Sequence, residues 1–86
     1  MNIGFHRNFI KQYKRVPKST RFRVDERLEL FELNALHPLL NTHPLTGNRT
    51  GQWSINITGD WRAIFVYQDR ETVIFIDLDT HSNLYK

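Results

Sequence analysis

The amino-acid sequence predicts an α+β domain in which a mostly antiparallel, four-stranded sheet has an N-terminal helical hairpin packed on one face. Three observations lead to this prediction. Two helical patterns lie in the first half of the chain, patterns with a period of two lie in the second half, and the turns between the latter are short. A chain of 86 residues has room for one hydrophobic core, so we expect residues 1–86 to form a single domain.

The composition excludes several classes of protein. Hydrophobic residues make up 40% of the chain and aromatic residues 13%, which indicates a folded core rather than disorder. The absence of cysteine excludes a disulfide framework, a thiolate metal site and a cysteine nucleophile. The N-terminus lacks the apolar segment of a signal peptide, and no apolar run approaches the roughly 18–20 residues that cross a bilayer. We therefore expect a cytoplasmic protein with no membrane segment.

Positive charge is concentrated near the N-terminus. The formal net charge is only +3, but the segment from Arg7 to Arg23 contains seven basic residues and no acidic one. Such a cluster is either the solvated face of a helix or a surface that meets the phosphates of a nucleic acid. Charge alone leaves both interpretations open.

A short strand and a basic helix are predicted at the N-terminus. Ile3 and Phe5 alternate with polar neighbours, as in a strand. From His6 onward the apolar residues recur at helical spacing, with basic residues on the other face. Pro17 ends this helix, because proline has no N–H and disfavours helical geometry at the preceding residue. The apolar positions are Phe5, Phe9, Ile10, Tyr13 and Val16, and the basic positions are Lys11, Lys14 and Arg15.

A second helix and a loop are predicted next, with the two helices forming a hairpin. Ser19 or Thr20 is expected to cap the second helix by accepting a backbone N–H. His37-Pro38 is expected to end it. The apolar stripe between these points consists of Val24, Leu28, Phe31 and Ala35. Residues 39–51 are predicted to form a loop, which Leu39, Leu40 and Leu45 are expected to anchor to the core.

Three strands joined by short turns are predicted in the second half. Residues 53–57 alternate between apolar and polar side chains, which indicates a half-buried strand. Thr58-Gly59 is a turn signal, and residues 61–67 follow as a strand with aromatic residues on one face. Residues 73–78 are almost entirely apolar, as in a central strand that is covered on both faces.

Residues suited to acid–base chemistry flank the last two strands. Asp60 and Arg62 are two apart, so they would point to the same side of a strand. A purely structural alternative is an exposed ion pair between them, which would stabilise the fold little. His81 follows the last strand, and Tyr85 would share its face if the chain there is helical. Among the four histidines, His81 is the first candidate for a functional role, and His43, in the loop, is the second.

No His-x-His or His-x-x-x-His pair, glycine-rich phosphate loop or nucleophile elbow is present in the sequence. Five motifs instead appear in a specific order and spacing that spans nearly the whole chain. They are Phe9–Lys14 (FIKQYK), His37–Leu40 (HPLL), His43–Gly47 (HPLTG), Ile57–Phe65 (ITGDWRAIF) and Thr80–Tyr85 (THSNLY). With these motifs the chain resembles the RelE/ParE superfamily of type II toxins, and within it the YafQ-like branch.

The resemblance implies a RelE-like fold and an mRNA endonuclease that acts mostly on ribosome-bound message. It implies that a cognate antitoxin of the RelB/DinJ kind, with a ribbon-helix-helix domain, holds the toxin inactive and alone connects it to operator DNA. It implies no cofactor, metal or membrane. Two alternatives remain: an inactive member that only binds its antitoxin, and a gyrase inhibitor as in the ParE branch, which the matches at Asp60 and His81 disfavour.

The resemblance also implies the site residues. Catalytic roles are implied for His43, Asp60, Arg62, His81 and Tyr85. RNA contacts are expected for Asn56, Trp61 and Arg49. The basic residues Lys11, Lys14 and Arg15 are expected to contact ribosomal RNA or, as the alternative, an acidic segment of the antitoxin. Asn56 stands where the YafQ-like pattern has a second histidine, so this chain has no titrating group at that position.

RNA cleavage by this route requires few groups. The 2′-OH of the RNA is the nucleophile, so the site must supply a base, positive charge on the phosphorane and an acid for the 5′-oxygen. Asp60 or His43 is the expected base, Arg62 the stabilising charge and His81 the acid. Tyr85 would stack on a base or orient the phosphate. The expected products are a 2′,3′-cyclic phosphate or 3′-phosphate end and a 5′-OH end.

Overall fold

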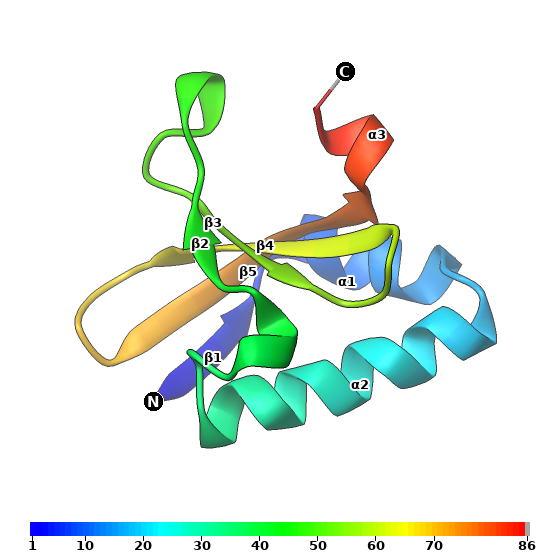
Figure 1. The fold of residues 1–86 in the computed structure, drawn as a ribbon, viewed down its shortest axis with the longest axis horizontal. Coiled ribbons are helices and arrows are strands. Elements are labelled where there is room, and N and C mark those ends of the chain that lie inside the picture. The colour runs from blue at the N-terminus through cyan, green and yellow to red at the C-terminus, as the bar shows by residue number, and fades with distance from the viewer. Residues whose placement is uncertain (86) are drawn as a thin grey trace.

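Five strands form one sheet in the computed structural model, which describes residues 1–85 (Figure 1). In chain order the elements are β1 (Asn2–Phe5), α1 (Arg7–Arg15), α2 (Lys18–Leu33), the 3₁₀ helix η1 (Pro38–Leu40), β2 (His43–Pro44), the 3₁₀ helix η2 (Gly47–Arg49), β3 (Trp53–Asn56), β4 (Trp61–Tyr67), β5 (Thr72–Thr80) and α3 (His81–Leu84). The order within the sheet is β1-β5-β4-β3-β2. Only β1 and β5 are parallel. The predicted α+β class, with a helical hairpin before antiparallel strands, is confirmed.

The sheet has one strand more than the four that the sequence predicts. The additional strand, β2, lies in the segment predicted as a loop and pairs with β3, where His43 is opposite Ser54 and Pro44 is opposite Trp53. Two residues are too few to show a period of two. The proline is tolerated because β2 is an edge strand, where a missing N–H need not break the ladder.

The start of α2 differs from the prediction. The helix begins at Lys18, and no side chain caps it, so the predicted cap at Ser19 or Thr20 is wrong. Pro17 occupies the N-cap position, and its carbonyl oxygen accepts a hydrogen bond from the N–H of Arg21. The proline both ends α1 and directs the chain into α2, so the connection between the helices is very short.

The end of α2 also differs. The helix ends at Leu33, before the expected stop at His37-Pro38. His37 instead begins η1, where its Nδ1 accepts a hydrogen bond from the N–H of Leu39. Of the three leucines expected to anchor the following segment, Leu40 and Leu45 are buried, but Leu39 is 59% exposed. The anchoring role predicted for Leu39 is therefore wrong.

Two separate apolar clusters cover the two faces of the sheet. The helical hairpin covers one face, and the core there includes Phe9, Val24, Phe31, Ala63, Phe65 and Phe75. A smaller cluster of Leu45, Ile64 and Leu84, with Ile76 packed against it, covers part of the other face. Ile64 and Phe65 are neighbours in β4 and belong to different clusters, because successive side chains of a strand point to opposite faces. The segment after β2 and the helix α3 therefore lie on the face opposite α1 and α2.

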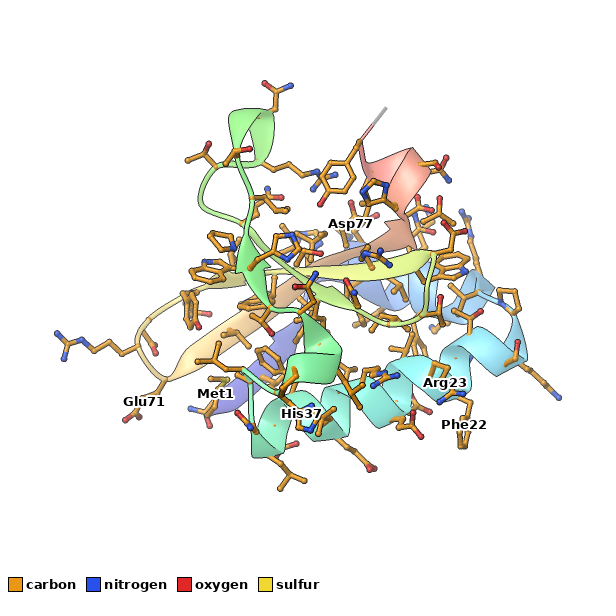
Figure 2. All side chains as sticks on the ribbon, in the orientation of Figure 1. Met1, Phe22, Arg23, His37, Glu71 and Asp77 are labelled. Carbon is orange, nitrogen blue, oxygen red and sulfur yellow. The ribbon has the colours of Figure 1, made fainter. Side chains whose placement is uncertain are left out.

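The outer surface of the hairpin is open to solvent. Figure 2 shows Phe22 pointing away from the sheet, and this side chain is 67% exposed. Arg23 pairs with Glu26 one helical turn later, at 2.9 Å between Nη1 and Oε1. Within residues 1–85 no helix has both the length and the apolar composition that crossing a membrane requires.

Candidate functional site

His43, His81 and Tyr85 lie together at one groove. The groove has a volume of about 310 Å³ and is lined by His43, Pro44, Leu45, Thr46, His81 and Tyr85. Its walls are β2 with the two residues after it and the helix α3. Leu45 and Leu84, which belong to the smaller apolar cluster, fix these walls to the sheet. The groove is therefore on the face that the helical hairpin leaves free.

The helix α3 brings His81 and Tyr85 side by side. The Thr80 hydroxyl accepts a hydrogen bond from the N–H of Asn83 and so caps the helix. One turn later the N–H of Tyr85 donates to the carbonyl oxygen of His81 at 3.2 Å. The two ring centroids are 4.7 Å apart. The helical geometry expected for this pair is confirmed, and both side chains are exposed.

The ring of His43 has a defined orientation. Its Nδ1 lies 2.7 Å from the carbonyl oxygen of Asn41. A carbonyl oxygen can only accept, so Nδ1 is the donor in this bond. In a neutral ring Nε2 then has the free lone pair. Pairing of His43 with Ser54 in the sheet fixes the backbone beneath the ring.

Asp60 lies beside α3 but does not line the groove. It is exposed in the turn before β4, and its N–H donates to the Thr58 hydroxyl at 3.2 Å. Its carbonyl oxygen accepts a hydrogen bond from the N–H of His81 at 2.8 Å. The backbone of Asp60 thus holds the start of α3, and its carboxylate is outside the residues that line the groove.

The guanidinium of Arg62 is bound by the turn between β3 and β4. Nη1 donates to the carbonyl oxygens of Thr58 at 2.9 Å and Trp61 at 3.0 Å, and Nη2 donates to that of Gly59 at 3.3 Å. No ion pair joins Arg62 to Asp60 in the described part of the chain. In the sheet Arg62 is opposite Asn56. Its positive charge is at the end of the sheet from which α3 starts.

The residues for which RNA contacts were expected are dispersed. Asn56 is half-buried, and its Oδ1 is buried without a hydrogen-bond partner. Trp61 packs against the core on the helical face. Lys11, Lys14 and Arg15 are exposed on α1, which covers that same face. The structure therefore does not bring the basic residues of α1 to the groove.

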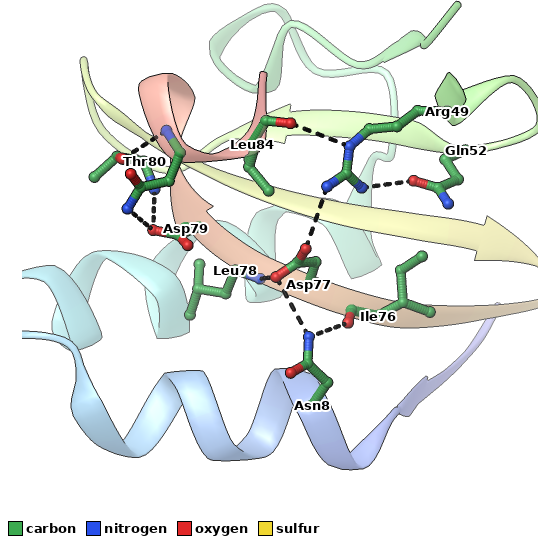
Figure 3. Close-up of polar contacts among 10 residues, drawn as sticks. Asn8, Arg49, Gln52, Ile76, Asp77, Leu78, Asp79, Thr80 and Leu84 are labelled. Carbon is green, nitrogen blue, oxygen red and sulfur yellow. Dashed lines mark hydrogen bonds and ion pairs between the residues drawn. The ribbon is translucent and has the colours of Figure 1, made fainter. Parts of the chain in front are cut away.

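Arg49, for which an RNA contact was also expected, makes three contacts within the chain (Figure 3). Nη1 donates to Oε1 of Gln52 at 2.8 Å, and Nε donates to the carbonyl oxygen of Leu84 at 3.4 Å. Nη2 pairs with Oδ2 of Asp77 at 3.5 Å. The side chain of Asn8 donates to the other oxygen of Asp77 at 3.4 Å.

Asp77 is a residue near the site that sequence reasoning missed. It is an acidic residue within the apolar run 73–78, on the central part of the sheet. A carboxylate in such a run needs a partner, because burying an unpaired charge is costly. That signal could have identified Asp77, although it does not tell which basic residue is the partner.

Among residues 1–85, no group of three or more histidine and acidic side chains is arranged to hold a metal ion.

A family model described as the bacterial toxin of a type II toxin-antitoxin system, YafQ, matches residues 1–86. The chain belongs to this YafQ toxin family, and the predicted resemblance to RelE-like type II toxins is confirmed.

Sequence similarity extends to a curated endoribonuclease. This chain is 34% identical to the endoribonuclease HigB of Proteus vulgaris over 58 residues, which are 67% of this chain. The match spans 61% of the length of that relative.

Solved structures are similar in fold. YafQ from E. coli strain BL21(DE3) has a TM-score of 0.80 at 21% identity, over 99% of this chain and 98% of that one. YafQ in the E. coli DinJ-YafQ complex has a TM-score of 0.74 at 22% identity, over the same shares. At these identities the similarity establishes the fold, which is that of the YafQ-like toxins.

Proposed function

We propose that this chain is an endoribonuclease toxin that cleaves mRNA on the ribosome by attack of the 2′-OH on the adjacent phosphate. The observation that supports the proposal best is the groove in which His43 faces a helix with His81 and Tyr85. Imidazole exchanges protons near neutral pH, so two of them at one groove can serve as base and acid for a single phosphate. The sequence similarity to an endoribonuclease gives independent support.

His43, His81 and Tyr85 have separate roles in the proposed reaction. Nε2 of His43 accepts the proton of the 2′-OH, because its Nδ1–H is engaged with the carbonyl oxygen of Asn41. The 2′-oxygen bonds to phosphorus as the bond from phosphorus to the 5′-oxygen breaks. His81 donates a proton to that 5′-oxygen, which leaves a 2′,3′-cyclic phosphate and a 5′-OH. Tyr85, beside His81, orients the phosphate or stacks on a base.

Asp60 and Arg62 act from the edge of this site. Arg62 supplies positive charge to the phosphorane once its guanidinium exchanges the turn carbonyls for phosphate oxygens. Asp60 is the second candidate for the base, and its position outside the groove favours His43. The nucleophile is part of the RNA, so the reaction needs no metal ion to generate one. Asn56, which is opposite Arg62 in the sheet, contributes a contact with the RNA strand there, whereas Trp61 packs on the helical face.

The proposed partners follow from the family. Similar structures include the DinJ-YafQ complex and a YoeB-YefM complex from Staphylococcus aureus. By analogy, a cognate antitoxin of the RelB/DinJ kind, with a ribbon-helix-helix domain, binds this chain in the cytoplasm and links it to operator DNA. Lys11, Lys14 and Arg15 face away from the groove, so they contact ribosomal RNA or the antitoxin rather than the phosphate that is cleaved.

The test is cleavage of a translated message by purified protein. The wild type should cut mRNA in a reconstituted translation system, and His81→Ala should lower kcat by about 100-fold or more, because the leaving oxygen loses its acid. Primer extension and end-group analysis measure the cut and its 5′-OH. Ser82→Ala, also exposed on α3, is the matched control. Equal cleavage by His81→Ala would refute the assignment.

Asn56, which replaces a histidine of the YafQ-like pattern, favours one rival function. In this rival the chain has lost activity and only binds its antitoxin. Induction without the antitoxin separates the two, because growth arrest with mRNA cleavage supports the toxin and absence of both supports the rival. DNA damage signalling would instead indicate a gyrase inhibitor.

A further inference from the structure

Arg49 joins three segments next to the groove, which are the segment after β2, the strand β5 and the helix α3. We propose that it is a positioning residue, which fixes α3 against the segment after β2 and so holds His81 and Tyr85 opposite His43; this role in catalysis rests on the proposed function. Arg49 lies in η2, its partner Asp77 lies in β5, and its partner Leu84 lies in α3 (Figure 3). Arg49 does not line the groove itself.

All three nitrogens of the guanidinium are used within the chain. Nε, Nη1 and Nη2 each donate to a different acceptor, on Leu84, Gln52 and Asp77. The Arg49 side chain is 26% exposed and that of Asp77 is 21% exposed. A planar guanidinium can satisfy acceptors in several directions at once, whereas a lysine ammonium cannot reproduce this fork. These contacts indicate that Arg49 supports the groove. Its guanidinium is engaged within the chain and is not a free phosphate-binding group.

Helix α3 has few other attachments to the body of the protein. It has four residues, and only Leu84 among them is buried. Its first N–H is bound by the carbonyl oxygen of Asp60, and its last carbonyl oxygen, that of Leu84, is bound by Arg49. Isolated helices this short are not stable, so α3 depends on these two backbone anchors, on the side chain of Leu84 and on the bonds of Asn83 to Thr80 and Asp79 near its start. Loss of Arg49 would free the end of α3 that bears Tyr85.

Asp77, in β5, binds the guanidinium of Arg49 to the sheet. Oδ2 pairs with Arg49, and Oδ1 accepts hydrogen bonds from the side chain of Asn8 and the N–H of Leu78. The carboxylate is thus held from α1 and from its own strand. It presents a fixed acceptor to Arg49, so the position of the guanidinium is set by the sheet.

The experiment compares Arg49→Met with Arg49→Lys and with Arg70→Met. Arg70 is exposed in the turn between β4 and β5, beside Glu71, which Figure 2 shows far from Asp77. Both methionine variants remove one positive charge, so a general loss of attraction to RNA is the same in each. The two readouts are hydrogen exchange of the Tyr85 amide in the free protein and kcat and KM for mRNA cleavage on ribosomes.

We expect Arg49→Met to increase exchange of the Tyr85 amide severalfold and to lower kcat by about tenfold, since a small misplacement of a catalytic group has such an effect. Its KM should change no more than that of Arg70→Met. Arg49→Lys should leave kcat low, because an ammonium cannot bind the three acceptors together. Asp77→Asn, which keeps the oxygen but removes the charge, should give a smaller increase in exchange and a smaller loss of kcat.

Three results would overturn the proposal. One is unchanged exchange of the Tyr85 amide in both Arg49→Met and Asp77→Asn. Another is full recovery of kcat in Arg49→Lys. The third is a raised KM with normal kcat and a salt dependence reduced by about one phosphate contact, which would make Arg49 an RNA ligand. Hydrogen exchange is measured without RNA. It therefore tests the attachment of α3 by Arg49 even if the wild type cleaves no message and the proposed function fails.

Discussion

At the scale of single residues, position relative to the groove distinguishes His43 from Asp60. Both are candidates for the base that activates the 2′-OH. The ring of His43 lines the groove with Nε2 unengaged, whereas the carboxylate of Asp60 is outside it. Asp60 uses its backbone instead, through the hydrogen bond to the N–H of His81. A residue can therefore matter to a site through its carbonyl oxygen, which substitution of its side chain leaves in place.

This difference gives a prediction. His43→Ala should lower kcat by about 100-fold because the base is lost, and Asp60→Asn, which keeps the backbone bond, should lower it less than about tenfold. Single-turnover cleavage of ribosome-bound mRNA measures both. A larger loss in Asp60→Asn than in His43→Ala would exchange the two roles.

At the scale of elements, a short side-chain hydrogen bond joins the two helices of the hairpin. The hydroxyl of Tyr13 in α1 donates to Oδ1 of Asp25 in α2 at 2.6 Å. This hydrogen bond, together with partial burial and the nearby charge of Asp25, raises the pKa of Tyr13 above its ordinary value of 10.0. The guanidinium of Arg21 also lies over the Tyr13 ring, 5.5 Å from its centroid. Removing the hydroxyl should weaken the attachment of α1 to α2 without creating a cavity in the core.

We predict that Tyr13→Phe lowers the free energy of unfolding by about 1 kcal/mol or less at neutral pH, because one partly exposed hydrogen bond is lost. The raised pKa means that folding favours the protonated tyrosine. The stabilisation is therefore fully present below pH 10 and is lost as the pH rises through the folded-state pKa.

Urea unfolding at pH 7 and at pH above 10 measures the effect of Tyr13→Phe. Tyr67→Phe is the matched control, since Tyr67 is 45% exposed and its hydroxyl has no hydrogen bond within residues 1–85. A difference between Tyr13→Phe and the wild type that stayed constant above pH 10 would contradict this account.

At the scale of the whole molecule, the sheet separates two surfaces. The groove lies on the face covered by Leu45, Ile64 and Leu84, and the basic helix α1 lies on the other. For the proposed endoribonuclease, substitutions should therefore be able to change binding to ribosomal RNA and cleavage of the message independently. A nuclease that works on a ribosome needs two separate surfaces, since it must contact the ribosome and the message at the same time.

Charge reversal on α1 tests this separation. Lys11→Glu, Lys14→Glu and Arg15→Glu combined should weaken co-sedimentation with ribosomes by about tenfold or more at low salt, since each lost phosphate contact weakens binding. Cleavage at saturating ribosome concentration should keep its kcat. Unchanged co-sedimentation would assign the basic surface to the antitoxin, and a lower kcat would contradict the separation of the two surfaces.

The sequence predicted the features that depend on local spacing. Helical and strand periods gave the class and the order of the elements, and the four-residue spacing of His81 and Tyr85 gave their contact in α3. It failed where structure is too short for a period, as in β2, and where a cap is set by backbone geometry, as at Pro17.

Only the tertiary structure determined which distant residues meet. His43 reaches α3 because β2 lies at the edge of the sheet beside β3, and Arg49 meets Asp77 and Leu84 across 28 and 35 positions of the chain. Neither pairing can be predicted from sequence patterns, since contacts of this kind depend on strand order and on which face each side chain occupies. The chain alone determined its fold class and its chemical groups; the folded sheet decided which of those groups share the groove.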